Sequence, residues 1–220
     1  MLETLVASVS LWARKGLDRP AQQMKDEKEI LTILSEDEYG KVLTELEHNL
    51  PKPRRIKRLA IQCTDTSRDD LDTRIRITDG KAQLMQKVGK WKSKTRKEIE
   101  VDMLEDPEMI LKTFKVLRNT MRGNKVRTSV IQTDSFVFEN KDFEIKITRQ
   151  FGKSNKYNAE IEVFDVKIEP EEIAEKFKIP IHLPEHTAEF WDNWSKAVNY
   201  YADELSEAEL LKTIKSYLID

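Results

Sequence analysis

Glutamates two residues apart recur in three stretches that alternate between polar and apolar residues. The pairs are Glu27 and Glu29, Glu98 and Glu100, and Glu160 and Glu162. Residues two apart on a strand point to the same side and lie about 7 Å apart, because a strand rises about 3.3 Å per residue. Pairs on neighbouring strands can therefore converge on one ion, and sites with only oxygen ligands suit Mg²⁺ or Mn²⁺.

Basic residues show the same two-residue spacing elsewhere. They are Arg74 and Arg76, joined by Lys87, and the pair Lys125 and Arg127. Arg and Lys suit phosphate groups, and Arg binds them through two parallel hydrogen bonds. If the charged faces enclose a cavity, a ligand that pairs these charges is favoured, because burying an unpaired charge is costly. If the sheet stays open, the same residues form an ordinary solvated face, and this alternative remains.

The segment 72–87 is expected to position the basic residues. Asp79-Gly80 separates two alternating runs and predicts a type I′ hairpin turn, which needs positive φ at both positions. Counting outward from this turn gives the pairs Thr78–Lys81, Arg76–Gln83, Arg74–Met85 and Asp72–Lys87. The hairpin should thus present a cationic face, with Ile75, Ile77, Ala82 and Leu84 on the opposite face.

The remaining alternating stretches bring the total to about eight strands, crossed by two helices. Further strands are expected at 27–34, 59–66, 96–103, 125–139, 142–151 and 157–165, and helices from Ser35 to Asn49 and from Pro107 to Gly123. A two-residue turn at Asn140-Lys141 would pair Phe138 with Phe143. The basic cluster at 52–58 is expected to be the solvated entrance of a strand, with phosphate contact as the alternative.

Composition excludes several classes of protein. The chain has 220 residues, a charged fraction of 35% and a formal net charge of −2, which argues against a general nucleic-acid-coating surface. Its single cysteine, Cys63, cannot form an internal disulfide, and three scattered histidines do not give a zinc site of usual spacing. No apolar run approaches the roughly 20 residues of a membrane span. A cytoplasmic protein without a membrane partner is expected.

The chain divides into three parts. Residues 1–26 are expected to form an N-terminal helix and linker, 27–168 the sheet domain, and 169–220 a helical extension packed on it. In the extension, Phe190, Trp191, Trp194, Val198 and Tyr201 form a stripe at helical spacing. Such a stripe is usually part of the core, and an exposed partner site is the alternative.

The order of these elements resembles the CYTH superfamily, the triphosphate tunnel metalloenzymes, over roughly residues 27–165. The matching pieces are Thr64-Asp-Thr66, Asp72-Thr-Arg-Ile-Arg76, Leu84-Met-Gln-Lys87, Arg96-Lys-Glu-Ile-Glu100, Lys125-Val-Arg127 and Glu160-Ile-Glu162. The resemblance implies an α+β fold in which an eight-stranded antiparallel β-tunnel, a closed barrel with crossing helices, carries helical N- and C-terminal extensions. Family members hydrolyse or cyclise triphosphates with Mg²⁺ or Mn²⁺.

The resemblance also implies roles for the charged residues. Glu27, Glu29, Glu160 and Glu162 would hold the metal, and Glu98, Glu100 and Lys87 would act in catalysis. Arg74, Arg76, Lys87, Lys125, Arg127 and Lys146 would bind the phosphates. Two positions depart from the family: Leu31 stands where its first strand has a lysine, and Glu144 or Lys146 replaces a late aspartate.

Four functions fit this pattern. The first is metal-dependent hydrolysis of inorganic tripolyphosphate or of a nucleoside or thiamine triphosphate. The second, which Leu31 favours, is a non-catalytic module that binds polyphosphate, a nucleotide or a triphosphorylated RNA 5′ end. The others are an adenylyl cyclase of the same fold and a plain interaction module that uses the C-terminal helices. The oligomeric state is left open, with a homodimer among the options.

Overall fold

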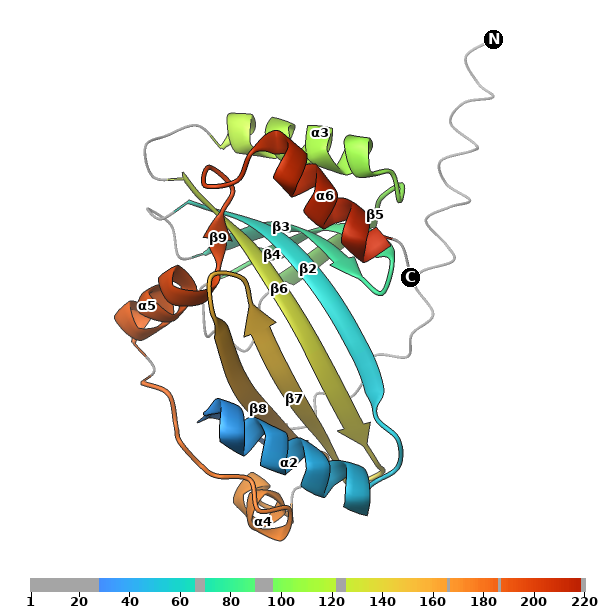
Figure 1. Ribbon diagram of the computed structural model, residues 1–220, viewed down its shortest axis with the longest axis vertical. Helices are drawn as coiled ribbons and strands as arrows, with labels where there is room; N and C mark the ends of the chain where they lie inside the picture. The colour runs from blue at the N-terminus through green and yellow to red at the C-terminus, as the bar shows by residue number, and fades with distance from the viewer. Residues whose placement is uncertain are drawn as a thin grey trace.

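The computed structural model describes residues 28–65, 70–89, 97–121, 126–165, 167–185 and 187–218 (Figure 1). The N-terminal helix and linker expected over 1–26 lie outside these ranges, as do the two predicted site residues Glu27 and Lys125.

A single antiparallel sheet forms the centre of the molecule. Its strands are β1 (Lys28–Leu34), β2 (Arg54–Asp65), β3 (Leu71–Thr78), β4 (Lys81–Val88), β5 (Lys97–Asp102), β6 (Val126–Glu139), β7 (Phe143–Phe151), β8 (Asn155–Val163) and β9 (Tyr200–Tyr201). The strand order is β1-β8-β7-β6-β2-β3-β4-β5, and the short β9 pairs with β6. The α+β class and the antiparallel sheet are as predicted. Within the described residues, the end strands β1 and β5 do not pair with each other, so hydrogen bonds do not close the tunnel.

Of the helices in the described ranges, four cover the outer side of the sheet in two groups and one lies beside the inner side. They are α2 (Glu36–Asn49), α3 (Pro107–Thr120), α4 (Pro170–Lys176), α5 (Ala188–Val198) and α6 (Glu207–Leu218). Helices α2 and α4 pack over β1, β7 and β8, while α3 and α6 pack over β2 and β3 (Figure 1). Two hydrophobic clusters result, and both lie on the side of the sheet opposite the charged residues. No helix in the described ranges combines the length and the hydropathy needed to cross a membrane.

The helix starts follow the capping signals in the sequence. Ser35 caps α2: its hydroxyl accepts a hydrogen bond from the Glu38 backbone N–H, and the Glu38 carboxylate accepts one from the Ser35 N–H at 2.8 Å. At α3, Asp106 accepts a hydrogen bond from the Met109 backbone N–H at 2.9 Å, and Pro107 occupies the first turn.

The β3–β4 hairpin has the predicted register. Thr78 pairs with Lys81, and the pairing continues to Asp72 with Lys87. Asp79 and Gly80 adopt φ values of 47° and 81°, as a type I′ turn requires. The aliphatic face is buried in the second cluster, and Arg74 and Arg76 lie on the other face, half-buried.

Three details of the sheet differ from the expectation. The β6–β7 register is shifted by two residues, so that Phe138 pairs with Ile145 and not with Phe143. The connection is longer because the Asn140 side chain accepts hydrogen bonds from two backbone N–H groups of the turn. Strand β2 begins at Arg54, so part of the basic cluster lies in the strand itself. Strand β5 is exposed on both faces, although its alternation of polar and apolar residues is typical of a strand with one buried face.

Candidate functional site

The charged faces of distant strands meet across the inner side of the curved sheet. A cavity of about 300 Å³ lies there, lined in part by Arg58, Arg74, Leu31, Lys146, Glu160 and Trp191. These residues come from β1, β2, β3, β7, β8 and α5, and β3 is separated from β7 by two strands. The polar faces of these strands therefore line one shared hollow, which is partly open to solvent.

Arg58 was not among the predicted site residues. Its guanidinium donates to the Thr78 hydroxyl at 3.2 Å, a neutral partner. Burial and the neighbouring Arg76 and Arg74 lower the pKa of Arg58, which means that its positive charge is held at a cost in this position. The basic cluster gave no reason to separate Arg58 from its neighbours, but the strand register does, because Arg58 pairs with Thr78 and thus shares the face of Arg76.

Arg76 and Lys87 contact the acidic strand β5. The Arg76 guanidinium donates to Glu100 at 2.7 Å and to the Gln83 side chain at 2.8 Å. Its Nε is buried and has no hydrogen-bond partner among the described residues. Lys87 forms an ion pair with Glu98 at 3.2 Å. Four of the predicted catalytic and phosphate-binding residues are therefore paired with one another in the absence of a ligand.

Glu98 is held in its charged form. Partial burial acts to raise its pKa, but the hydrogen bond and the positive charge of Lys87 outweigh burial and lower it. Glu98 and Glu100 lie on one face of β5, opposite Lys87 and Met85 in the β4–β5 register. Their arrangement suits neutralising and orienting the basic residues.

Lys146 and Glu160 form an ion pair that lines the cavity. The Lys146 ammonium donates to the Glu160 carboxylate at 2.6 Å, and the two residues face each other across β7 and β8. Arg74 is likewise paired, with Asp72 on its own strand. The predicted residues Arg74, Lys146 and Glu160 thus line one cavity, and each cation carries a carboxylate partner.

A row of carboxylates crosses the neighbouring strands at the level of Glu162. Glu29 on β1 and Glu144 on β7 are its two register partners, so the three residues share one face. Burial and the negative charge of Glu139 raise the pKa of Glu144. Among the described residues, no group of three or more His, Cys, Asp or Glu side chains comes close enough to hold a metal ion. Proteins usually bind Mg²⁺ through one or two carboxylates with substrate phosphates completing the shell, so the row alone is not a complete metal site.

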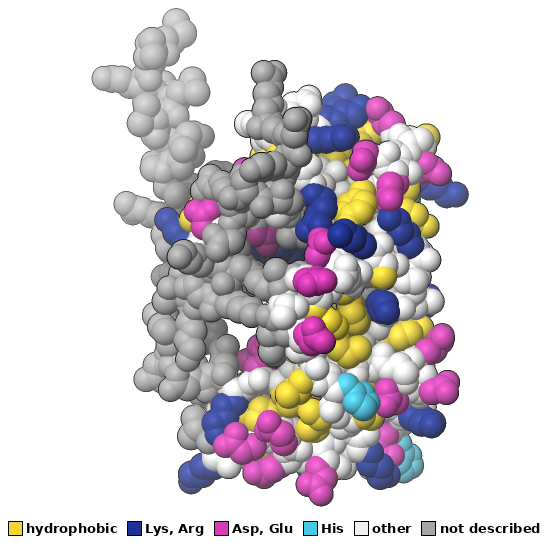
Figure 2. All heavy atoms as spheres, turned by 90° about the vertical axis from the view of Figure 1, so that its left-hand side faces the viewer, with side chains coloured by type: hydrophobic (Ala, Val, Ile, Leu, Met, Phe, Trp, Pro, Cys, Tyr) yellow, Lys and Arg dark blue, Asp and Glu magenta, His cyan; other side chains and the backbone are white. Residues whose placement is uncertain are grey.

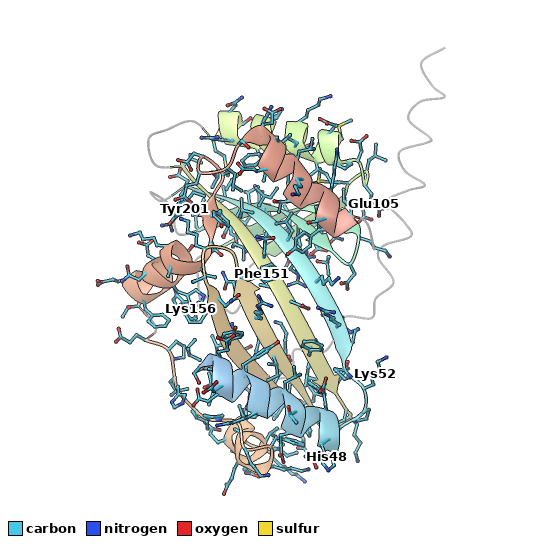
Figure 3. The ribbon with its side chains drawn as sticks, in the orientation of Figure 1. His48, Lys52, Glu105, Phe151, Lys156 and Tyr201 are labelled. Atoms are coloured by element: carbon cyan, nitrogen blue, oxygen red, sulfur yellow. The ribbon has the colours of Figure 1, made fainter. Side chains whose placement is uncertain are left out.

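Helix α5 lies beside the inner face and contacts it through several side chains. The Trp194 indole N–H donates to Gln150 of β7 at 3.0 Å, and the Gln150 amide donates to Asn199 at 2.7 Å. Arg127 on β6 forms an ion pair with Asp192 of α5. Figure 3 shows Lys156 and Phe151 at the end of the β7–β8 hairpin next to α5, and the Lys156 ammonium lies 5.5 Å from the centre of the Trp194 ring. The predicted phosphate ligand Arg127 is therefore engaged by the C-terminal extension.

The side of the molecule from which α5 projects carries charges of both signs. Figure 2 shows Lys and Arg side chains next to Asp and Glu side chains on this face, separated by small hydrophobic areas. This mixture agrees with the ion pairs described above.

No protein-family model matches the sequence, and no curated protein matches it. Solved structures match. One is HpAC1 from Hippeastrum, a candidate adenylyl cyclase described as having a dominant triphosphatase activity. It is 14% identical to this chain with a TM-score of 0.54, and the match covers 78% of this chain and 96% of HpAC1. A candidate adenylate cyclase from Bacillus halodurans is 13% identical with a TM-score of 0.51, and the match covers 75% of this chain and 98% of that one. The chain therefore has the fold of CYTH-type triphosphatases and adenylate cyclase-like proteins.

Proposed function

We propose that the protein hydrolyses a triphosphate inside the hollow of the sheet, with Mg²⁺ or Mn²⁺. The observation that carries this proposal is the meeting of Arg58, Arg74 and Lys146 from three separate strands in one cavity. The triphosphatase activity described for HpAC1, which shares the fold, supports it. A phosphate chain would bring negative charge to Arg58, whose hydrogen-bond partner is the neutral Thr78, and would compete with the carboxylate partners of Arg74 and Lys146.

The basic residues would bind and orient the phosphates. Arg58 and Arg74 offer planar donors that can bind phosphate oxygens through two hydrogen bonds each, and Lys146 adds a mobile ammonium. Phosphoryl transfer gains most from neutralising charge that develops on phosphate oxygens. Arg76 and Lys87, farther along the same face, would receive the remaining phosphate once their carboxylate partners yield. Arg127 can join them if Asp192 releases it.

The carboxylates would bind the metal and accept the proton of the attacking water. Glu29 and Glu162 lie opposite each other in the β1–β8 register and are the pair that we assign to the metal, in place of the Glu160 side chain that binds Lys146. The metal would supply charge neutralisation to the phosphates. Glu144, the third carboxylate of this row, would accept the proton of the attacking water.

Binding without turnover is the second candidate. Leu31 lines the cavity at the position where the resemblance places a lysine, and it lies opposite Glu160 in the β1–β8 register. A missing cation weakens catalysis more than binding if that cation acts on the transition state. Arg58 lines the same cavity and replaces the lost charge, so we favour hydrolysis.

Phosphate release tests the proposal. The purified protein should release phosphate from tripolyphosphate or from ATP when Mg²⁺ or Mn²⁺ is added and should stop when EDTA is added. Arg74→Ala should lower kcat/KM at least tenfold, because one charged hydrogen-bond donor is lost. The matched control is Arg149→Ala, whose side chain donates to Asn155 and not into the cavity. Tripolyphosphate binding without any release would establish the second candidate, and the absence of both would refute a triphosphate site.

Glu162→Gln separates the metal from the rest of the site. We expect it to raise the Mn²⁺ concentration needed for half-maximal activity at least tenfold. Glu171→Gln, on the exposed first turn of α4, should leave that concentration unchanged. Equal effects of the two substitutions would contradict the assignment of Glu162.

A further inference from the structure

We propose that the triphosphate carries a nucleobase and that the indole ring of Trp191 stacks on that base. This inference rests on the proposed function and names the substrate class that the same site takes. It is carried by the aromatic wall that α5 adds to the cationic cavity.

The two tryptophans of α5 that line the cavity differ in how they are held. Trp194 is 8% exposed, donates its indole N–H to Gln150 and lies beside the Lys156 ammonium. Trp191 is only half-buried, and its ring stands at 61° to the Trp194 ring with 6.0 Å between the centres. Phe190 contacts Trp191 edge-on with 5.1 Å between the ring centres, and its ring centre also lies 6.1 Å from that of Trp194. Trp194 and Phe190 therefore fix Trp191, and Trp191 keeps a free surface.

The aromatic stripe of α5 was expected to be part of the core. This expectation is correct for only some of its residues. Val198 is fully buried and Trp194 nearly so, as a core stripe requires. Trp191 instead lines a cavity that Arg58, Arg74 and Lys146 also line. A large flat apolar ring that shares a cavity with three cations is suited to a ligand with one aromatic end and one anionic end.

Inorganic tripolyphosphate has no group that such a ring could bind. Its surface consists of charged oxygens, which would lose hydration against an indole and gain no hydrogen bond. A nucleoside triphosphate offers both ends: phosphates for the cations and a base for the ring. Stacking of a base on an aromatic side chain is worth about 5- to 150-fold in affinity. The cavity, about 300 Å³, is at the lower end of the range of small-molecule sites, so the base and the phosphates would fill it.

The test compares two ligands that differ only in the nucleoside. The probes are β,γ-imido-ATP and inorganic imidotriphosphate, with affinities measured by calorimetry in the presence of Mg²⁺. The preference for the nucleotide, as the ratio of the two Kd values, should fall at least tenfold in Trp191→Ala. It should fall less than threefold in Trp191→Phe, which keeps an aromatic face. An unchanged ratio in Trp191→Ala, with or without a parallel loss of both affinities, would overturn the inference.

The outcomes separate the inference from the proposed function. If the wild type binds and hydrolyses tripolyphosphate as well as ATP and Trp191→Ala changes neither preference, the function stands and the stacking role fails. If the wild type binds neither probe, the proposed function fails first. A short RNA with a 5′ triphosphate that binds more tightly than the ATP analogue would assign the site to an RNA end and overturn the choice of a free nucleotide.

Discussion

The Asp192 carboxylate of α5 pairs with the Arg127 guanidinium of β6, so the C-terminal extension occupies a cation of the inner face. Hydrogen bonds from Lys196 and then from Arg127 lower the pKa of Asp192, and the carboxylate is charged at neutral pH. If Arg127 binds a phosphate of the substrate, the Asp192 carboxylate occupies the position of that phosphate. Helix α5 and the substrate would then compete for one guanidinium.

The first prediction is that Asp192→Asn tightens the binding of tripolyphosphate about threefold to tenfold, because Arg127 no longer has a charged competitor. The cost in stability should stay below about 1 kcal/mol, since the pair is only partly buried. Calorimetric titration and thermal melting measure the two effects. The matched control is Glu204→Gln, which breaks the Lys153–Glu204 ion pair of the same extension. Weaker binding in Asp192→Asn would show that the ion pair positions Arg127 and does not compete for it.

The second prediction is that Arg58→Met raises stability and weakens binding. The lowered pKa of Arg58 shows that the fold disfavours its charge next to Arg74 and Arg76, so a neutral side chain of similar length should raise the melting temperature. The same change should weaken tripolyphosphate binding at least tenfold, because a charged hydrogen bond to phosphate is lost.

Arg55→Met is the control for Arg58→Met, from the same strand but the opposite face. Arg55 forms an ion pair with Asp134 and lies over the Phe136 ring. Its loss should lower stability slightly and leave binding unchanged. If both substitutions change binding alike, the effect comes from net charge and not from the cavity.

The third prediction concerns acid stability through Glu38. A hydrogen bond from the Ser35 backbone, together with His182, lowers the pKa of Glu38 from 4.5 to about 2. A lowered pKa in the folded state gives stability that is fully present above pH 4.5 and is lost as the pH falls toward 2. Glu38→Gln keeps the capping box but loses the negative charge at the helix N-terminus, so it should be less stable than the wild type at pH 7 by about 0.3–1 kcal/mol. The difference, measured by urea unfolding, should shrink between pH 4.5 and pH 2, and a constant difference across that range would contradict it.

The sequence predicted those features that depend on local geometry. The Asp79-Gly80 turn has one length and one type, so the register of β3 and β4 followed from it residue by residue. The Asn140 turn was predicted too short, but a shift of two residues keeps the same side chains on each face. The polar face of β7, with Lys146, was therefore correct in spite of the wrong partners.

Other features depend on contacts between distant segments. Arg58 stood in a run of basic residues, and only its pairing with Thr78 shows that it faces inward. Trp191 belonged to a stripe typical of a buried helix, and its place in the cavity follows from where α5 docks on the sheet. Glu29 and Glu162 could be expected to share a face, but their side-by-side position depends on the β1–β8 pairing. The resemblance supplied the inward direction of all these faces, because periodicity alone fits an open sheet equally well.

The turn between β7 and β8 holds the C-terminal end of α5. The Lys153 backbone N–H donates to the Val198 carbonyl at 2.9 Å, and the Ser154 hydroxyl donates to the Ala197 carbonyl at 2.8 Å. Gly152 lies so close that an added Cβ would stand 2.4 Å from the Val198 carbonyl oxygen. Glycine at 152 is therefore required by the close approach of α5.

The fourth prediction is that Gly152→Ala displaces α5 from the cavity. The close contact is with the backbone carbonyl oxygen of Val198, so the helix end has to move, and overpacking of this kind costs about 1–3 kcal/mol. Because Trp191 is carried by α5, the preference for β,γ-imido-ATP over imidotriphosphate should fall together with the melting temperature. Gly40→Ala is the matched control: no atom lies within 4 Å of its added Cβ, and it should stabilise α2 by about 0.5–1 kcal/mol without changing the preference. A Gly152→Ala protein that loses stability but keeps its nucleotide preference would separate the docking of α5 from the recognition of the base.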